Sequence, residues 1–361
     1  NSALIFFTIQ KLLADTNEIM SNMKKLFVFI MFLACTACTT NNPYILDLRE
    51  EIPIEAVSYP NEVIMGNPLD INLINNNLYI FVYQGDYPIL ILDPEDGHLI
   101  KEWGARGNGP GEFGDYPIPW GRCKDKLFIH DENRFIVHQY DIKEQEGISS
   151  LSFVKDFAFS RFKYTFGYGT FLENGKVVVN SINNTPQPLM LMNLQLDSLN
   201  NFGGVVPDQN EYSLGLFTSE LASYGNTFVQ AMKNFGYLAC YEQTGEKDVI
   251  LKWKYYLQPL KFKDNQLDKS MKEGFCSIKM TKNYIFAVYK GCLPTDEKRI
   301  FNHILMFDHN GKLLRNFRVT NNDSLGKIEI SEDEKTIYVS CYEPEPAILR
   351  IDISEYVISV H

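Results

Sequence analysis

The sequence has no run of 18 apolar residues, and it contains fewer positively than negatively charged residues. A transmembrane helix needs about 20 predominantly apolar residues, so we expect no such span. Its 34 Lys and Arg are outnumbered by 45 Asp and Glu, which gives a formal net charge of −11. Nucleic-acid binding needs clustered cationic side chains, so we expect no nucleic-acid partner. An apolar fraction of 45% excludes a disordered chain.

Catalytic and metal-binding signatures are also scarce. No G-x-S-x-G elbow and no H-E-x-x-H motif occurs. Five of the seven cysteines lie beyond the N-terminal region, widely spaced and without the spacing of a zinc site. Cys276 and Cys292 are the best candidates for a disulfide, because they would lie near the same end of two adjacent strands. The alternative is that these cysteines are buried thiols.

The N-terminal region has the order of an export signal. Lys24 and Lys25 follow Met23, and an apolar stretch over 26–34 precedes small residues and cysteines. The sequence over 35–38 resembles a bacterial lipoprotein cleavage site, which implies lipidation of Cys38, with Cys35 as the second choice. An ordinary secretory signal is the alternative. The predicted segments are an upstream extension over 1–22, a signal peptide over 23–38, a linker over 39–51 and one domain over 52–361.

Short β-rich runs recur along the rest of the chain at intervals of 49 to 57 residues. Five of the six runs are followed by a second apolar run that closes with Asp or Asn, and most units then show a third run that ends in an aromatic residue. The first runs of the six units begin at Leu78, Leu127, Val177, Phe228, Ile285 and Ile337. Such a period indicates a repeat architecture.

Each unit holds about four short strands joined by hairpin turns, which describes a propeller blade. The sequence therefore predicts an all-β, six-bladed β-propeller of four-stranded antiparallel blades. The sixth unit lacks its last strand, and residues 52–57 form a lone apolar run. We predict that this N-terminal strand completes blade six and closes the ring, which removes exposed sheet edges.

The glycine-rich stretch over 103–113, followed by residues 127–137, resembles an NHL repeat. The sequence departs from the NHL pattern by placing Arg134 directly after Asn133. A phosphate loop is not expected, because prolines and no helical period follow the glycines. With the lipoprotein signal, the mature chain resembles exported NHL-like or TolB-like propeller lipoproteins of Gram-negative bacteria. That resemblance implies the fold and a cell-envelope location, held by a lipid anchor on a membrane, and little about chemistry.

In propellers, the crossovers between blades and the loops joining second and third strands lie on one face, which commonly binds ligands. Aromatic, charged and amide side chains there suit a glycan, a peptide or a protein. The predicted ligand-binding residues are Tyr83, Arg106, Glu112, Asp131, Arg134, Tyr168, Asn183, Lys290 and Glu343. Structural roles are the alternative: Asp131 and Arg134 would cap a turn, and Arg106 and Glu112 would brace the glycine loop.

These features favour a binding propeller without catalytic residues or a resident cofactor. The alternative is a metal-dependent hydrolase or lyase, similar to six-bladed lactonases, with one divalent metal such as calcium in the channel. Asp131, Glu112 and Asn183 would then contribute ligands. A third possibility is a scaffold that makes its contacts through blade edges.

Overall fold

The computed structural model is built of strands alone over the residues it describes. Two compact units divide the chain at Ile45, and every strand belongs to the second unit, Leu46–His361. Among the described residues there is no helix with the length and hydropathy that a membrane span requires. The described residues are 45–48, 50–60, 66–145, 148–158, 166–181, 187–193, 195, 197–204, 215–263, 266–321 and 324–357.

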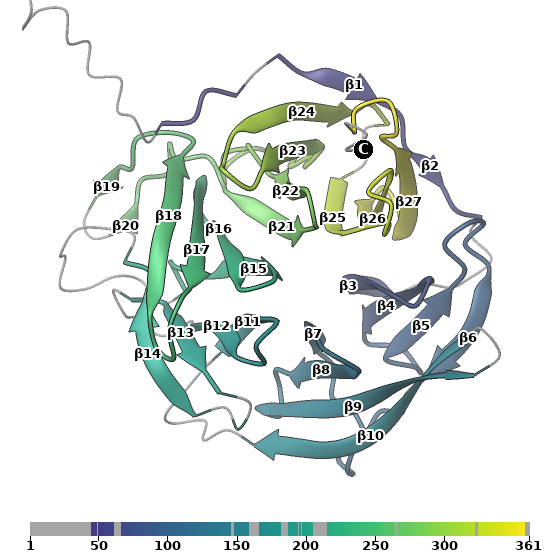
Figure 1. Ribbon diagram of the computed structural model, residues 1–361. Coiled ribbons are helices and arrows are strands. Elements are labelled where there is room, and N and C mark those ends of the chain that lie inside the picture. Colours follow the sequence, from purple (N-terminus) through teal and green to yellow (C-terminus); the bar gives the residue numbers. More distant parts are fainter. Residues whose placement is uncertain are drawn as a thin grey trace, which may run out of the picture. The chain divides into compact units, whose positions relative to one another are not determined.

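Six antiparallel blades stand around a central axis, in chain order from blade one to blade six (Figure 1). Blade one contains β3 (Asn67–Ile74), β4 (Asn77–Tyr83), β5 (Ile89–Leu92) and β6 (Leu99–Trp103). Blade two contains β7 (Pro117–Cys123), β8 (Lys126–Asp131), β9 (Ile136–Gln145) and β10 (Ile148–Ala158). Blade three contains β11 (Phe166–Phe171), β12 (Val177–Ser181), β13 (Leu189–Met192) and β14 (Ser198–Phe202). Within each blade, strands adjacent in sequence are hydrogen-bonded neighbours.

The second half of the ring repeats this plan. Blade four contains β15 (Ser219–Tyr224), β16 (Thr227–Met232), β17 (Tyr237–Gln243) and β18 (Val249–Tyr256), and a hairpin of β19 (Phe262–Lys263) and β20 (Gln266–Leu267) follows it. Blade five contains β21 (Phe275–Met280), β22 (Tyr284–Tyr289), β23 (His303–Asp308) and β24 (Leu313–Val319). Blade six contains β25 (Ser324–Ile330), β26 (Thr336–Glu343) and β27 (Ala347–Asp352). The predicted six-bladed architecture is confirmed.

The middle strands of the blades are buried along most of their length, whereas the outermost strands are largely exposed. All four residues of β5 are buried, for example, while β6 has no buried residue. A middle strand is covered on both faces by neighbouring blades, so its side chains form a nearly continuous apolar run. These are the runs whose recurrence is visible in the sequence.

The N-terminal segment pairs with two blades. β2 (Val57–Ser58) lies antiparallel to β27 and supplies the fourth strand of blade six, as predicted. β1 (Ile52–Ile54) instead pairs in parallel with β24, as a fifth strand of blade five. The prediction that all of 52–57 belongs to blade six was therefore wrong in part. Pairing β1 with β24 covers an edge strand whose backbone groups would otherwise be unpaired.

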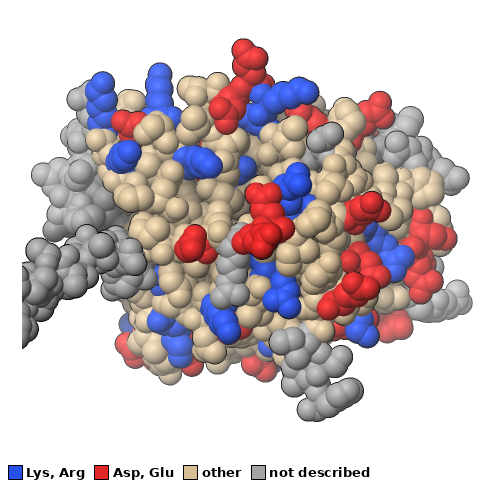
Figure 2. Space-filling model, turned by 90° about the horizontal axis from the view of Figure 1, so that it is seen from above, with Lys and Arg blue, Asp and Glu red and all other residues tan. Residues whose placement is uncertain are grey.

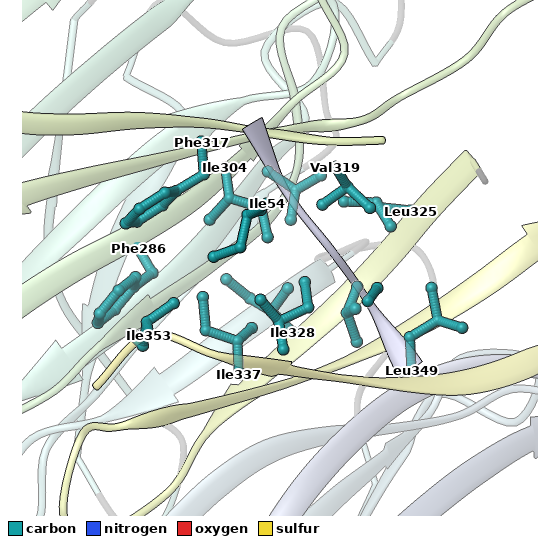
Figure 3. Packing of buried hydrophobic residues seen from close by; sticks show 14 of the residues in the cluster. Ile54, Phe286, Ile304, Phe317, Val319, Leu325, Ile328, Ile337, Leu349 and Ile353 are labelled. Carbon is teal, nitrogen blue, oxygen red and sulfur yellow. The ribbon is translucent and has the colours of Figure 1, made fainter. Parts of the chain in front are cut away.

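The interface between blades five and six shows how this segment closes the ring. Ile54 of β1 is 8% exposed and belongs to the apolar cluster between these blades. Figure 3 shows its side chain among Ile304, Val319 and Ile328, which come from three different strands. Burial of apolar surface therefore holds the N-terminal segment in addition to its backbone hydrogen bonds.

Candidate functional site

The innermost strands of all six blades line a cavity of about 890 Å³ in the central channel. One part of its wall is made by small neutral residues of three consecutive blades: Gly121 of β7, Thr170 of β11 and Ala222 of β15. A Cβ atom built on Gly121 would meet no atom within 4 Å, which shows that this position faces open space. The small side chains leave room for a ligand on this side.

The opposite part of the wall is polar and charged. It is formed by Asn72 of β3, Lys279 of β21 and Glu329 of β25. Lys279 Nζ lies 3.0 Å from Glu329 Oε2, and the amide of Leu73 donates to the same oxygen at 3.2 Å. Burial opposes the charge on Lys279, but Glu329 and Asp70 together raise the pKa of its ammonium group. The wall thus presents a fixed pattern of charges and an amide.

A buried cluster bounds the inner end of this cavity. Lys327 of β25 forms an ion pair with Glu220 of β15, and its Nζ lies 4.1 Å from the ring centroid of Tyr168 of β11. Lys233 Nζ lies 3.3 Å from Glu220 Oε1 and donates to the Tyr168 hydroxyl at 3.1 Å. Burial opposes the charge on Lys327, but Glu220 and Tyr168 outweigh it and raise its pKa. These contacts join blades three, four and six across the axis.

Asp70 of β3 lies in the same region and is buried. Burial raises the pKa of its carboxyl group, although Lys327 and Lys279 act in the opposite direction. Its Oδ1 accepts the amide of Ile71 at 2.7 Å. Asp70 thus adds a buried carboxyl group near Lys327 and Lys279 to the wall of the cavity.

At its other end the cavity reaches the turns that join first and second strands. Lys124, Glu173, Lys282 and Glu332 line it there, together with Tyr224, which is 46% exposed. The crossovers and the loops between second and third strands lie at the opposite ends of these strands. The cavity therefore reaches the face opposite to the one on which the sequence analysis places the ligand.

Four of the predicted residues organise the crossover between blades one and two. Arg106 donates to the carbonyls of Val82, Gly85 and Gly114, and the amide of Gly109 donates to Glu112 at 2.7 Å. Arg134 donates to the carbonyls of Gly107, Asn108 and Glu112. Asp131 accepts the amide of Gly114 at 2.6 Å and lies 4.0 Å from Arg134. These contacts match the bracing and capping roles considered for the four residues.

A pocket of about 430 Å³ adjoins this crossover and is lined by Arg106, Asn108, Asp86 and Asp115. It lies apart from the central cavity, because the two share no lining residue.

The remaining predicted residues are dispersed. Tyr168 lines the central cavity, whereas Tyr83 stacks on Tyr116 with their ring centroids 4.5 Å apart. Lys290 lies 3.7 Å from Glu273, and Glu343 is exposed at the end of β26. Asn183 and the proposed lipidation site Cys38 lie outside the described residues.

The candidate disulfide between Cys276 and Cys292 is not formed, because both residues are free thiols, which was the alternative considered. Cys276 lies against the backbone carbonyls of Leu325 and Gly326, which belong to blade six. Burial raises the pKa of its thiol to about 12. This cysteine therefore behaves as a packed, unreactive side chain.

The residues that sequence reasoning missed are the charged side chains of the innermost strands, namely Asp70, Glu220, Lys279, Lys327 and Glu329. In the sequence, each of these residues lies in the short run just before one of the six repeat starts, such as Leu78 or Phe228. This pattern becomes readable only once the innermost strand of each unit has been assigned.

The donor set of the channel does not fit a divalent cation. Glu220 and Glu329 are each paired with a lysine, which would have to be displaced. Asp131 and Glu112 hold backbone amides of the crossover instead. Within the described part of the chain, three metal-ligating groups converge only at Asp93, Asp96 and His98, on the turn between β5 and β6. We therefore assign no metal-dependent step to the channel.

Comparison with known proteins supports the architecture. A candidate exported protein from Bacteroides fragilis superimposes with a TM-score of 0.55 at 12% identity, over 85% of this chain and 97% of the other. A streptogramin B lyase superimposes with a TM-score of 0.51 at 10% identity, over 83% and 98% of the two chains. The likeness is one of fold. No protein-family model matches the sequence, and no curated protein matches it.

Proposed function

We propose that this chain is an exported, lipid-anchored propeller of the cell envelope that binds a small polar ligand in its central channel. The observation that carries the proposal is the cavity of about 890 Å³, which all six blades line. Cavities of roughly 300 to 1,000 Å³ are typical of small-molecule sites. Amide, hydroxyl and paired charged groups beside an exposed tyrosine suit a glycan or a short peptide.

The anchor part of the proposal rests on Cys38 and on the resemblance to NHL-like or TolB-like lipoproteins. We expect Cys38→Ala to abolish incorporation of radiolabelled palmitate and to release the protein from membranes. Label that persists in Cys38→Ala and disappears only in Cys35→Ala would move the modified position to Cys35.

The ligand part can be tested with two matched tyrosines. Tyr224 lines the cavity and is 46% exposed, whereas Tyr87 lies on the opposite face and is 42% exposed. A panel of monosaccharides, disaccharides and short peptides is screened by thermal unfolding, and hits are measured by calorimetry. We expect Tyr224→Ala to weaken binding about tenfold through loss of an aromatic contact. We expect Tyr87→Ala to leave affinity unchanged.

The same pair of variants discriminates between the two faces. Loss of affinity in Tyr87→Ala alone would place the ligand on the crossover face. The absence of any hit from the whole panel would count against a small-molecule site and favour a protein-binding scaffold.

A further inference from the structure

The outer side of blade four carries a basic stretch in an otherwise acidic chain. Residues 249–272 contain six lysines, two aspartates and no Glu or Arg, although the whole chain has a net charge of −11. This stretch forms β18 and the hairpin β19–β20. Figure 2 shows more Lys and Arg towards its left, the side on which Figure 1 places β18 and β19, and more Asp and Glu towards its right, with both kinds present on each side.

One of these lysines is held in an ion pair, and two others lie near a single aspartate. Lys252 forms an ion pair with Glu242 at 2.6 Å, and Asp268 lies close enough to Lys261 and Lys263 to interact with their charges. As far as the structure describes the chain, the other exposed lysines here form no ion pair. They are Lys261, Lys263, Lys269 and Lys272.

Exposed apolar side chains lie on β18, the strand that precedes the hairpin. Ile250 and Leu251 on β18 are 46% and 48% exposed. Trp253 and Tyr255 follow on the same strand, with ring centroids 5.5 Å apart. Lysines beside aliphatic and aromatic side chains are typical of surfaces that lie in the interface of an anionic bilayer.

The N-terminal segment meets the propeller at the same strand. The amide of Leu46 donates to the carbonyl of Tyr256, the last residue of β18, at 2.8 Å. Cys38 precedes Leu46 by eight residues, which span at most roughly 28 Å when fully extended. A lipid on Cys38 would therefore hold blade four close to the bilayer.

We propose that the outer side of blade four, made by β18 and the hairpin β19–β20, docks on anionic lipid headgroups. This inference rests on the lipid anchor of the proposed function for its geometry. The lysines attract the headgroups, and Ile250 and Leu251 enter the interfacial region. The negative net charge of the whole chain opposes binding to anionic lipids. The membrane, however, interacts mainly with the charge of the surface that faces it. The lipid and this face together fix which blade points towards the membrane.

The test uses the chain from Thr39, which lacks the apolar signal stretch and any lipid, because every described strand lies within Leu46–His361. Binding is measured by co-sedimentation with vesicles of phosphatidylcholine alone or mixed with phosphatidylglycerol. We expect binding to the mixed vesicles only, and weaker binding at higher salt.

Matched lysine variants then locate the face. We expect the triple variant Lys261→Gln, Lys263→Gln and Lys269→Gln to bind roughly 100-fold more weakly. The control variant is Lys101→Gln, Lys143→Gln and Lys155→Gln, which removes the same charge from exposed positions of blades one and two. We expect it to bind as the parent chain does.

Equal weakening in both triple variants, or equal binding to both kinds of vesicle, would overturn the proposal. The anchor is tested separately by palmitate labelling of the full chain with Cys38 intact, and the Cys38→Ala full chain is its unlabelled control. Vesicle binding by the chain from Thr39, without palmitate labelling of the full chain, would retain the docking face and reject the anchor. Labelling of the full chain without vesicle binding would retain the anchor and reject the docking face.

Discussion

Lys327 of blade six and Glu220 of blade four, 107 residues apart in the chain, form a buried ion pair across the central channel. Both side chains are only 6% exposed. The pair joins blades that are not neighbours in the ring, and Tyr168 of blade three packs on the lysine from a third direction. This cluster therefore ties three blades together beside the cavity.

Lys327→Met should lower the free energy of unfolding by about 3–5 kcal/mol, because it leaves the Glu220 carboxylate buried with only Lys233 near it. Urea denaturation measures the change. Adding Glu220→Gln should recover much of the loss, since the second substitution removes the uncompensated charge. Lys252→Met, in the exposed pair with Glu242, is the control and should change stability little. If Lys327→Met and Lys252→Met lower the free energy of unfolding equally, burial does not strengthen the contribution of the Lys327–Glu220 pair to stability.

Stability should fall as the solution is acidified, in part because of His130. Burial lowers the pKa of this histidine from 6.5 to about 4. The unfolded chain therefore binds the proton more readily, so the contribution is complete above about pH 6.5 and is lost as the pH falls towards 4. The loss amounts to about 3 kcal/mol. Urea denaturation over a pH series measures it.

His130→Phe provides the comparison for that series. The ring of His130 lies 4.9 Å from that of Trp120, and phenylalanine keeps an aromatic ring in this place without a titrating group. The variant should lose less stability than the parent chain between pH 6.5 and 4. Identical pH profiles for the two proteins would assign the acid sensitivity to other groups.

Arg134→Gln should loosen the crossover over 104–116 and cost about 2 kcal/mol, because three backbone carbonyls lose a charged donor. Hydrogen exchange should become faster in that segment while the middle strands of blade two remain protected. Arg134→Lys should restore only part of the protection, since an ammonium group cannot reproduce the planar fork of a guanidinium. If hydrogen exchange over 104–116 is unchanged in Arg134→Gln, Arg134 does not brace the crossover.

Ile54→Ala should destabilise the protein by about 2–4 kcal/mol, because Ile54 is buried between blades five and six. Val57 is the matched control three residues later, since it is 67% exposed and lies in the same segment. Val57→Ala should leave the midpoint of urea denaturation nearly unchanged. A similar shift for both variants would show that the segment acts through its backbone alone.

The fold was predictable because each blade contributes a recurring apolar run to the sequence. The six repeat anchors, from Leu78 to Ile337, all fall in the second strand of a blade. These strands are covered on both faces, so their composition is apolar and recurrent. The pairing of β1 with blade five was not predictable, since a strand of three residues takes its partner from the surrounding packing.

The site was much harder to predict. Tyr168 is the one predicted ligand-binding residue that the structure places in the central cavity among those it describes. Lys327 and Glu220 meet only because the ring closes, and nothing in their separate local sequences marks them as partners. Arg106 stands out beside glycines and Arg134 stands out directly after Asn133, yet both guanidinium groups donate to backbone carbonyls at the crossover.

The pairing of the N-terminal segment has a consequence for the order in which the ring forms. The Ile54 carbonyl accepts a hydrogen bond from Thr320, 266 residues later. The strands β1 and β2 are thus made long before β24 and β27, with which they pair. Long-range pairing of this kind is slow to form. The ring therefore closes only after the strands of blades five and six have been made.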